Sequence, residues 1–308
     1  MKNILITGAA GFIGSSLAER LSQNKEYSLV LVDNFLTGKE QFIVKKDNTQ
    51  FIKADVNQYE DIAPLMSANR FDYVFHYAAV VGVQRTLQNP VMVLHDIEGL
   101  KNILSLAKNT GVERVFFSSS SEVYGEPVEI PQNESTTPLN ARLPYAIVKN
   151  LGEAFLRSYQ QEYGLNYTIF RFFNTYGARQ SPDFVMSKFI QKAKKNEDIT
   201  VYGDGSQTRT FCYVEDNLDA TVRTLEENLF VNDVVNIGSD IEISILDLAK
   251  LIIEITGSES KIVHLPPLKE GDMSRRKPDV TNMKKLLQHD FTPIEEGIRK
   301  VIEAQNAQ

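Results

Sequence analysis

Cysteine is almost absent from this chain of 308 residues, because Cys212 is the only one. A single thiol excludes an internal disulfide and any metal cluster built from several thiolates. Histidine is also scarce, and the four histidines are scattered without the spacing of metal ligands. We therefore expect no metal site.

Long apolar runs and an excess of positive charge are missing as well. No stretch reaches membrane-spanning length, and the amino terminus enters a strand-like segment without the layout of a signal peptide. The net charge of −7 argues against a surface that binds nucleic acid. A hydrophobic content of 42% and a charged content of 24% are typical of soluble globular proteins. We expect a cytoplasmic protein that binds neither nucleic acid nor membrane.

The amino-terminal segment is an apolar strand that runs directly into closely spaced glycines. Residues 2–7 indicate a buried parallel strand, and a helical pattern follows over residues 12–24. Between them, Gly8 can take the tight turn, Gly11 lets the backbone approach a pyrophosphate, and Gly14 lets the helix pack on the strand. The helix amino terminus then favours phosphate charge. The segment predicts a dinucleotide cradle formed by Gly8, Gly11, Phe12, Ile13 and Gly14.

A second strand, residues 28–32, ends at Asp33, about twenty residues after the glycines. A carboxylate at this place can accept both hydroxyls of an adenosine ribose and would repel a 2′-phosphate. The sequence therefore favours NAD over NADP.

Further strands, over residues 50–54, 72–76 and 112–117, alternate with helical segments. This order predicts an α/β fold with a doubly wound parallel Rossmann sheet, whose site lies at the carboxyl ends of the strands. We expect His76, at one such end, to be a packing or turn residue rather than a catalyst. Other strand-end residues are expected beside the cofactor, namely Asp55 and Val56 at the adenine edge and Ala78 and Ala79 where the backbone passes closely.

The last of these strands opens onto four consecutive serines, residues 118–121, and then Glu122. About twenty-five residues later, Tyr145 and Lys149 follow at a helical spacing that places both side chains on one face. The Lys149 ammonium stabilises a phenolate and so lowers the pKa of Tyr145 from its usual value of about 10. Tyr145 can then take a proton from a substrate hydroxyl while hydride leaves the same carbon for a nicotinamide. One of the serines would hold that hydroxyl in line.

This tyrosine–lysine spacing is weak evidence by itself. A chain with 12 tyrosines contains about one such match by chance, as an ordinary pair on a helix surface. Its weight comes from its position after the serines, in a chain that already has a cofactor cradle. A protein that senses NAD without turnover is the alternative, but it has no need for Tyr145 and Lys149 in register with the serines.

Together these motifs resemble the extended short-chain dehydrogenase/reductase family, in its NAD-dependent nucleotide-sugar epimerase/dehydratase/decarboxylase branch. The matching segments extend over essentially the whole chain and are residues 7–14, 33–35, 76–79, 118–125, 145–149, 171–177, 201–209 and 275–279. The resemblance adds Asn34 to the cofactor residues. It implies Ser120 as the catalytic hydroxyl and Tyr145 as the base, with Lys149 also contacting the nicotinamide ribose.

The resemblance also implies residues that grip the diphosphate of a sugar nucleotide. Asn174 and Arg209 are the first two, and either Arg275 or Arg276 is the third. Guanidinium groups suit this task because their fork of donors matches phosphate oxygens.

Members of this branch oxidise the sugar at C4 and differ in how they use the ketone. Glu122 stands where dehydratases hold the base that removes the C5 hydrogen, which the 4-ketone acidifies. We therefore favour a dehydratase-type reaction on a nucleoside-diphosphate hexose. Ser121, however, replaces the aspartate that protonates the leaving hydroxyl in 4,6-dehydratases, so that proton would come from elsewhere. Glu122 has a plainer alternative as a strand-end acid in water or a buried acceptor.

Two other reactions remain open. A 4-epimerase of the UDP-glucose or UDP-GlcNAc type needs only the serine, tyrosine and lysine. A UDP-glucuronate decarboxylase is favoured by residues 236–279, which are most similar to those enzymes. Against a uronic acid, Ser181 stands where glucuronate 4-epimerases place a carboxylate-binding arginine.

We expect two domains that interleave in sequence. Residues 1–175 with about 211–238 would bind NAD, and about 176–210 with 239–308 would bind the nucleotide sugar. The resemblance implies a homodimer formed through two helices of each chain. The apolar positions of 91–108 and 145–163 are candidates for that contact, although core packing explains them equally well.

Overall fold

The computed structural model describes residues 1–267 and 275–306, which form two compact units. The first unit comprises Met1–Val123, Ala141–Arg171 and Thr221–Val235. The second comprises Tyr124–Asn140, Phe172–Ala220 and the described part of Asn236–Gln308. Residues 124–140, 172–175, 211–220 and 236–238 therefore group with the second unit, whereas the sequence analysis assigned them to the NAD-binding domain. In 124–140 the reason is visible, because Gln132 exchanges backbone hydrogen bonds with Lys277 and Asp279.

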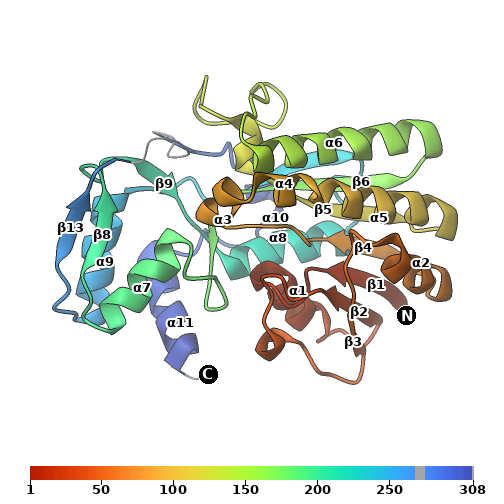
Figure 1. The fold of residues 1–308 in the computed structure, drawn as a ribbon, viewed down its shortest axis with the longest axis horizontal. Helices are drawn as coiled ribbons and strands as arrows, with labels where there is room; N and C mark the ends of the chain where they lie inside the picture. The colour runs from red at the N-terminus through yellow and green to blue at the C-terminus, as the bar shows by residue number, and fades with distance from the viewer. Residues whose placement is uncertain (268–274, 307–308) are drawn as a thin grey trace. The chain divides into compact units, whose positions relative to one another are not determined.

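The first unit is built on a seven-stranded sheet (Figure 1). In spatial order its strands are β11 (Asp233–Ile237), β6 (Asn166–Phe172), β5 (Arg114–Ser120), β4 (Tyr73–His76), β1 (Lys2–Thr7), β2 (Tyr27–Asp33) and β3 (Thr49–Lys53). The pairings from β5 through β4, β1 and β2 to β3 are parallel. The order reverses at β1, as in a doubly wound sheet, so the predicted fold class is confirmed.

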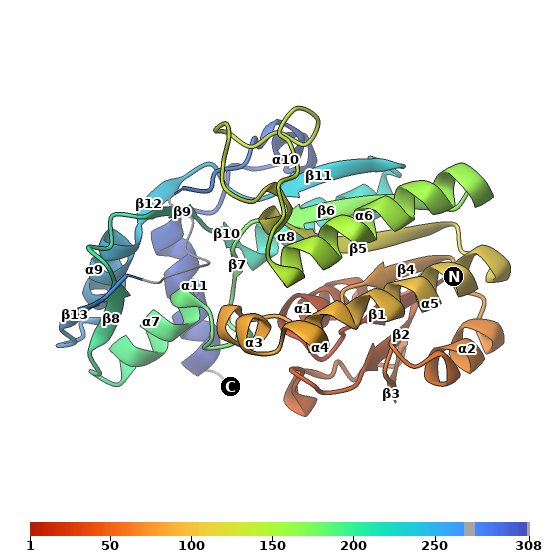
Figure 2. The same cartoon turned by 45° about the horizontal axis from the view of Figure 1, so that its top comes forward.

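Helices cover this sheet because its strands are apolar on both sides. Leu5 belongs to a core that α2, α5 and α6 share, while Ile4 and Ile6 on the opposite face are equally buried. Figure 2 shows α2, α5 and α6 side by side, and the contacts agree. The helices in this unit are α1 (Phe12–Leu21), α2 (Tyr59–Ala68), α3 (Val83–Gln88), α4 (Pro90–Leu94), α5 (Asp96–Thr110), α6 (Pro144–Tyr163) and the end of α8 (Val214–Glu226). A short 3-10 turn, Glu40–Phe42, lies between β2 and β3.

The helix predicted over residues 91–108 is divided at His95 into α4 and α5. The N–H of Glu98 bonds to the His95 carbonyl, three residues back, so the backbone is wound more tightly there. By contrast α6 is continuous. Pro144 begins it, where a missing N–H is no loss, and Gly164 ends it in the left-handed conformation with φ of 71°.

The second unit combines short strand pairs with helices. Its pairs are β8 (Ile199–Tyr202) with β13 (Ile262–Leu265), β9 (Thr208–Thr210) with β12 (Glu242–Ser244), and β7 (Thr175–Tyr176) with β10 (Cys212–Tyr213). Its helices are α7 (Val185–Lys194), α9 (Ile245–Thr256), α10 (Thr281–Leu286), α11 (Ile294–Asn306) and the beginning of α8. Apolar residues of α7, α9 and α11 share one core with β8. Ser244 caps α9 by accepting the Asp247 N–H. Within residues 1–267 and 275–306, every helix is too short or too polar to cross a bilayer.

Candidate active site

The turn after β1 brings backbone into contact with backbone. Gly8 has φ of 71°, and a Cβ added there would lie 2.8 Å from the Ala78 nitrogen. A Cβ on Gly14 would lie 2.2 Å from the Gly8 carbonyl oxygen, so glycine is required at both positions. Gly11 precedes α1, whose amino terminus has no side-chain cap among the described residues and no acid in its first turn. These features suit a pyrophosphate, which would use the N–H groups of that turn.

Thr7 ties the end of β1 to the loop after β4. Its Oγ1 accepts the N–H groups of Tyr77 and Ala78, both at 3.2 Å, and lies 3.0 Å from Nδ1 of His76. Burial, reinforced by the charge of Lys149, lowers the pKa of His76 to about 3. His76 is therefore neutral at pH 7, which is compatible with the packing or turn role expected from the sequence.

The Asp33 carboxylate organises the loops around the cradle. Its Oδ2 accepts the Ala10 N–H at 2.9 Å and its Oδ1 accepts the Phe35 N–H at 2.8 Å. Nearby, Nδ2 of Asn34 donates to Oδ2 of Asp55 at 3.1 Å. Each oxygen of a carboxylate has two acceptor sites, so Asp33 retains capacity for ribose hydroxyls.

Strand β5 extends through three of the four serines, further than the sequence suggested. Ser121 then begins a short 3-10 turn, Ser121–Tyr124. Oγ of Ser118 donates to the His76 carbonyl at 3.3 Å and accepts from Nζ of Lys149 at 3.5 Å. Oγ of Ser120 accepts the Glu122 N–H at 3.2 Å. A hydroxyl that accepts one hydrogen bond keeps its proton for donation, so Ser120 can hold a substrate oxygen.

Tyr145 and Lys149 occupy consecutive turns of α6. The Lys149 side chain is buried, with Nζ 5.7 Å from the centroid of the Tyr145 ring. Tyr145 is only partly buried. Burial lowers the pKa of Lys149 to about 8, and the negative charge of Asp96 acts in the opposite direction. The structure thus brings the predicted base, its cationic partner and the end of β5 together in one unit.

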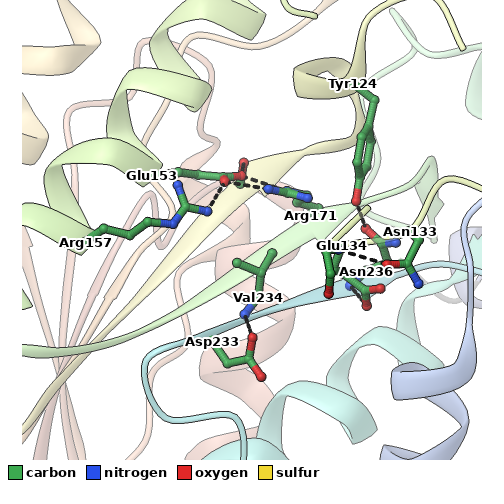
Figure 3. Close-up of polar contacts among 11 residues, drawn as sticks. Tyr124, Asn133, Glu134, Glu153, Arg157, Arg171, Asp233, Val234 and Asn236 are labelled. Carbon is green, nitrogen blue, oxygen red and sulfur yellow. Dashed lines mark hydrogen bonds and ion pairs between the residues drawn. The ribbon is translucent and has the colours of Figure 1, made fainter. Parts of the chain in front are cut away.

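Two carboxylates near this group, the partly buried Asp96 and the buried Glu153, were not predicted to take part in the site. Asp96 begins α5, and its Oδ2 accepts the Val80 N–H at 2.6 Å. Glu153 lies one turn beyond Lys149 and accepts hydrogen bonds from Ser119 and from Arg171, the second of which is drawn in Figure 3. The spacing of four from Tyr145 to Lys149 to Glu153 was the available signal, because it places all three on one helix face.

The second unit holds the residues predicted to bind a diphosphate. Asn174, Arg209 and Arg275 are linked to strand β9 by hydrogen bonds, Arg275 through Glu242. Nδ2 of Asn174 donates to the Thr210 carbonyl at 3.0 Å, and Nη1 of Arg209 donates to the Thr208 carbonyl at 2.7 Å. Arg275 bonds to Glu242, which also accepts from Oγ1 of Thr208.

The two alternatives for the third diphosphate contact differ in exposure. The Arg275 side chain is 52% exposed, whereas Arg276 is 6% exposed. Arg275 shares the Glu242 carboxylate with Lys277, at 3.0 and 3.1 Å.

Comparison with known proteins gives consistent matches over the whole chain. The model described as "NAD dependent epimerase/dehydratase family" matches residues 4–238. UDP-N-acetyl-alpha-D-glucosaminuronate decarboxylase of Bacillus cytotoxicus is 37% identical over 318 aligned positions, covering 98% of this chain and 97% of that protein. A putative UDP-glucose 4-epimerase of Methanocaldococcus jannaschii is 34% identical, covering 97% of each. The structure of UDP-glucose 4-epimerase with UDP-glucose from Thermotoga maritima has a TM-score of 0.93 at 33% identity, covering 99% of each chain.

Proposed function

The chain belongs to the NAD dependent epimerase/dehydratase family, and on that premise we propose that it oxidises C4 of a nucleoside-diphosphate sugar. The observation that carries the proposal is the buried Lys149 ammonium beside Tyr145 and the serines that end β5. A cofactor-binding protein without turnover gains nothing from burying a cation next to a phenol, because burial of charge is costly.

NAD would be held by the elements around the glycine turn. The N–H groups at the start of α1 and the glycines would take the pyrophosphate, and Asp33 with Asn34 would take the adenosine ribose. Asp55 and Val56 would line the adenine, while Ala78 and Ala79 would border the cofactor farther along. When bound, NAD accepts the hydride that leaves the sugar carbon.

The chain's own residues handle the proton. Ser120 donates a hydrogen bond to the C4 oxygen and holds it in line, and Tyr145 removes the hydroxyl proton. The Lys149 ammonium electrostatically stabilises the phenolate form of Tyr145, which becomes a neutral phenol when it takes the proton. Asn174, Arg209 and either Arg275 or Arg276 bind the diphosphate. The nucleoside is proposed to be uridine because the relatives compared above carry UDP-sugars in their names.

Two uses of the 4-ketone have a specific observation behind them. The position of Glu122, whose N–H bonds to Ser120, favours dehydration with Glu122 as the C5 base and Ser121 beside it. The decarboxylase relative favours loss of CO₂ from a uronic sugar, because a carboxyl group at C6 is β to a C4 ketone. Epimerisation, which needs neither group, has support from the two epimerase relatives.

The test is incubation of the holoenzyme with a panel of UDP-sugars, following cofactor reduction by absorbance and products by mass. The native chain should reduce its cofactor with at least one sugar, and Tyr145→Phe should not. Loss of water, loss of CO₂ or an unchanged mass with a changed sugar would identify the reaction. If no sugar nucleotide gives reduction or product, the NAD-sensing alternative replaces the enzyme.

Glu122→Gln separates dehydration from the other two reactions. The amide cannot remove the C5 hydrogen, so C4 oxidation should persist while solvent deuterium no longer enters at C5. The readouts are cofactor absorbance and the product mass in D₂O. Unchanged turnover in Glu122→Gln would exclude the dehydratase-type role.

A further inference from the structure

The Glu153 carboxylate is fully buried in the first unit and accepts four hydrogen bonds, of which Figure 3 shows those from Arg157 and Arg171. Its Oε1 accepts Oγ of Ser119 at 2.6 Å and Nε of Arg171 at 2.9 Å. Its Oε2 accepts Nη2 of Arg171 at 2.7 Å and Nη2 of Arg157 at 2.9 Å. A carboxylate offers about four acceptor sites, so this one is saturated. Its orientation is therefore fixed from several directions.

The partners of Glu153 come from different elements of the sheet layer. Glu153 belongs to α6, Ser119 to β5 and Arg171 to β6. The fork of Arg171 is bidentate, which restrains angle as well as distance. The cluster therefore restrains both the rotation of α6 about its axis and its displacement along the strands.

The contact next to Glu153 leaves little room for adjustment. A Cβ on Gly152 would lie 2.6 Å from Cζ of Phe117 and 3.0 Å from Cδ2 of Leu100. The backbone of α6 thus packs directly against side chains of β5 and α5. Phe117 and Ser119 are two apart on β5, so they share the sheet face on which α6 lies.

The same helix and the same strand carry the proposed catalytic groups. Tyr145, Lys149 and Glu153 follow at intervals of four, each about 6 Å farther along one face of the helix. Ser119 is directly between Ser118, which meets Lys149 at 3.5 Å, and Ser120. Any shift of the helix at Glu153 therefore changes the distance from the base to the serine hydroxyls.

We propose that Glu153 is a positioning residue, which holds the base-carrying helix α6 in register with strand β5 through its hydrogen bonds to Ser119 and Arg171. This inference rests on the proposed function, because it assigns the base to α6. Glu153 itself would touch neither sugar nor cofactor.

Its charge state agrees with this role. Burial alone would raise the pKa of Glu153, but the hydrogen bonds and charge of Arg171, with Ser119 and Arg157, hold it below the usual range. The carboxylate is ionised at neutral pH and can accept all four hydrogen bonds.

Replacing the Glu153–Arg171 ion pair should have different effects if the pair only stabilises the fold and if it positions α6. Apolar side chains of similar volume often substitute for a buried ion pair without loss of stability. They cannot reproduce directional hydrogen bonds, so they would leave α6 free to settle in another register. The double variant Glu153→Met/Arg171→Met therefore separates the two roles.

In this double variant we expect a folded protein whose kcat for C4 oxidation falls about 100-fold, with the KM for the sugar nucleotide little changed. Ser119→Ala is the second variant, since it removes one hydrogen bond and leaves the ion pair intact. It should lower kcat less, at nearly unchanged melting temperature. Arg114→Met is the control, because Arg114 is a buried arginine at the opposite end of β5 that donates to the carbonyls of Thr224 and Leu229. It should lower the melting temperature without changing kcat.

A second readout needs no substrate. In holoenzyme labelled with ¹³Cζ-tyrosine, the Tyr145 resonance is identified by its absence in Tyr145→Phe and titrated against pH. Its midpoint should move upward in the double variant and in Ser119→Ala, because Lys149 no longer sits at the phenol.

The two readouts keep this inference separate from the proposed function. If the native chain converts no sugar nucleotide, the proposed function fails, and the Tyr145 titration still decides the role of Glu153. An unchanged midpoint in the folded variants, or native kcat in either of them, would overturn the positioning role. If the double variant does not fold, Ser119→Ala decides alone.

Discussion

Burial and the surrounding charges and hydrogen-bond partners together decide the charge state of single ionisable residues here. His76 and Glu153 are buried ionisable groups of the first unit, and Asp96 is a partly buried one. His76 is kept neutral, whereas Glu153 is kept charged by its arginine partner. Their partners lie far away in sequence, 69 residues for His76 with Thr7 and 34 for Glu153 with Ser119. The spacing of four along α6 could have indicated Glu153, but it does not identify the distant partners, Ser119 and Arg171, that define its role.

His76 should make the protein less stable in acid. Its pKa is about 3 when folded and about 6.5 when unfolded, so only the unfolded state takes up a proton between these values. The stability is fully present above pH about 6.5 and falls towards pH about 3. His76→Gln cannot titrate, so its free energy of unfolding should depend less on pH than that of the native chain. Urea unfolding at pH 7 and pH 5 measures this.

The control for this prediction is His264→Gln, because His264 is exposed. It should preserve the native dependence on pH. An equally steep dependence in His76→Gln would contradict the assignment.

Asp96 should set the upper pH limit of the reaction. Its charge raises the pKa of Lys149 against the effect of burial, which brings that pKa to about 8. Asp96→Asn removes the charge but keeps an oxygen for the Val80 N–H. The pKa of Lys149 should fall further, so activity should be lost at lower pH than in the native chain, as measured by the pH profile of kcat. Glu98→Gln, a change at an exposed side chain of the same helix, should leave the pH profile of kcat unchanged. If Asp96→Asn loses activity at the same high pH as the native chain, the prediction is wrong.

At the scale of elements, the sequence predicted best where the signal is local. The strand, glycine turn and helix at the amino terminus follow one another in one continuous segment of sequence, and they form β1 and α1 as expected. The division of α4 from α5 was not foreseen, because periodicity continues through His95. The pairing of β9 with β12 joins strands about thirty residues apart, and each strand is too short for its sequence pattern to predict which strand it pairs with.

Gly14→Ala should damage the first of these elements. The added Cβ would meet the Gly8 carbonyl oxygen at 2.2 Å, so α1 must move away from the turn. Overpacking of this kind costs about 1–3 kcal/mol of stability, and the displaced helix terminus should bind NAD more weakly. Calorimetric titration with NAD and thermal unfolding measure the two effects.

Gly164→Asn provides the comparison for this change. It lies at the end of α6, where a Cβ meets nothing within 4 Å among the described residues, and asparagine tolerates the left-handed conformation. Equal NAD affinity in both variants would show that the glycine turn does not hold the cofactor.

At the scale of the whole molecule, exposed apolar side chains on α3, α4 and α6 lead us to propose a homodimer, as the resemblance implies. Leu87, Val91 and Leu94 are 41–66% exposed, and Ile147 and Leu151 are 42% and 44% exposed. Helix α4 packs on α3 and α6, and exposed apolar side chains on neighbouring helices favour self-association.

If the chain forms the proposed homodimer, Leu151→Glu should make it monomeric, because the change places a charge among the proposed apolar contacts. Sedimentation velocity at micromolar concentration measures the change. Val128→Glu, a substitution at a 64% exposed position of the second unit, should remain dimeric. If the native chain sediments as a monomer, the homodimer proposal is wrong.

The path of the chain also constrains how the protein can be made. It passes from one unit to the other at residues 123, 140, 171, 220 and 235. The edge strand β11, residues 233–237, joins the sheet last although β1 is translated first. The seven-stranded sheet therefore cannot be completed during synthesis until residues 233–237 have been translated. Neither unit can be transplanted into another gene as a single continuous fragment.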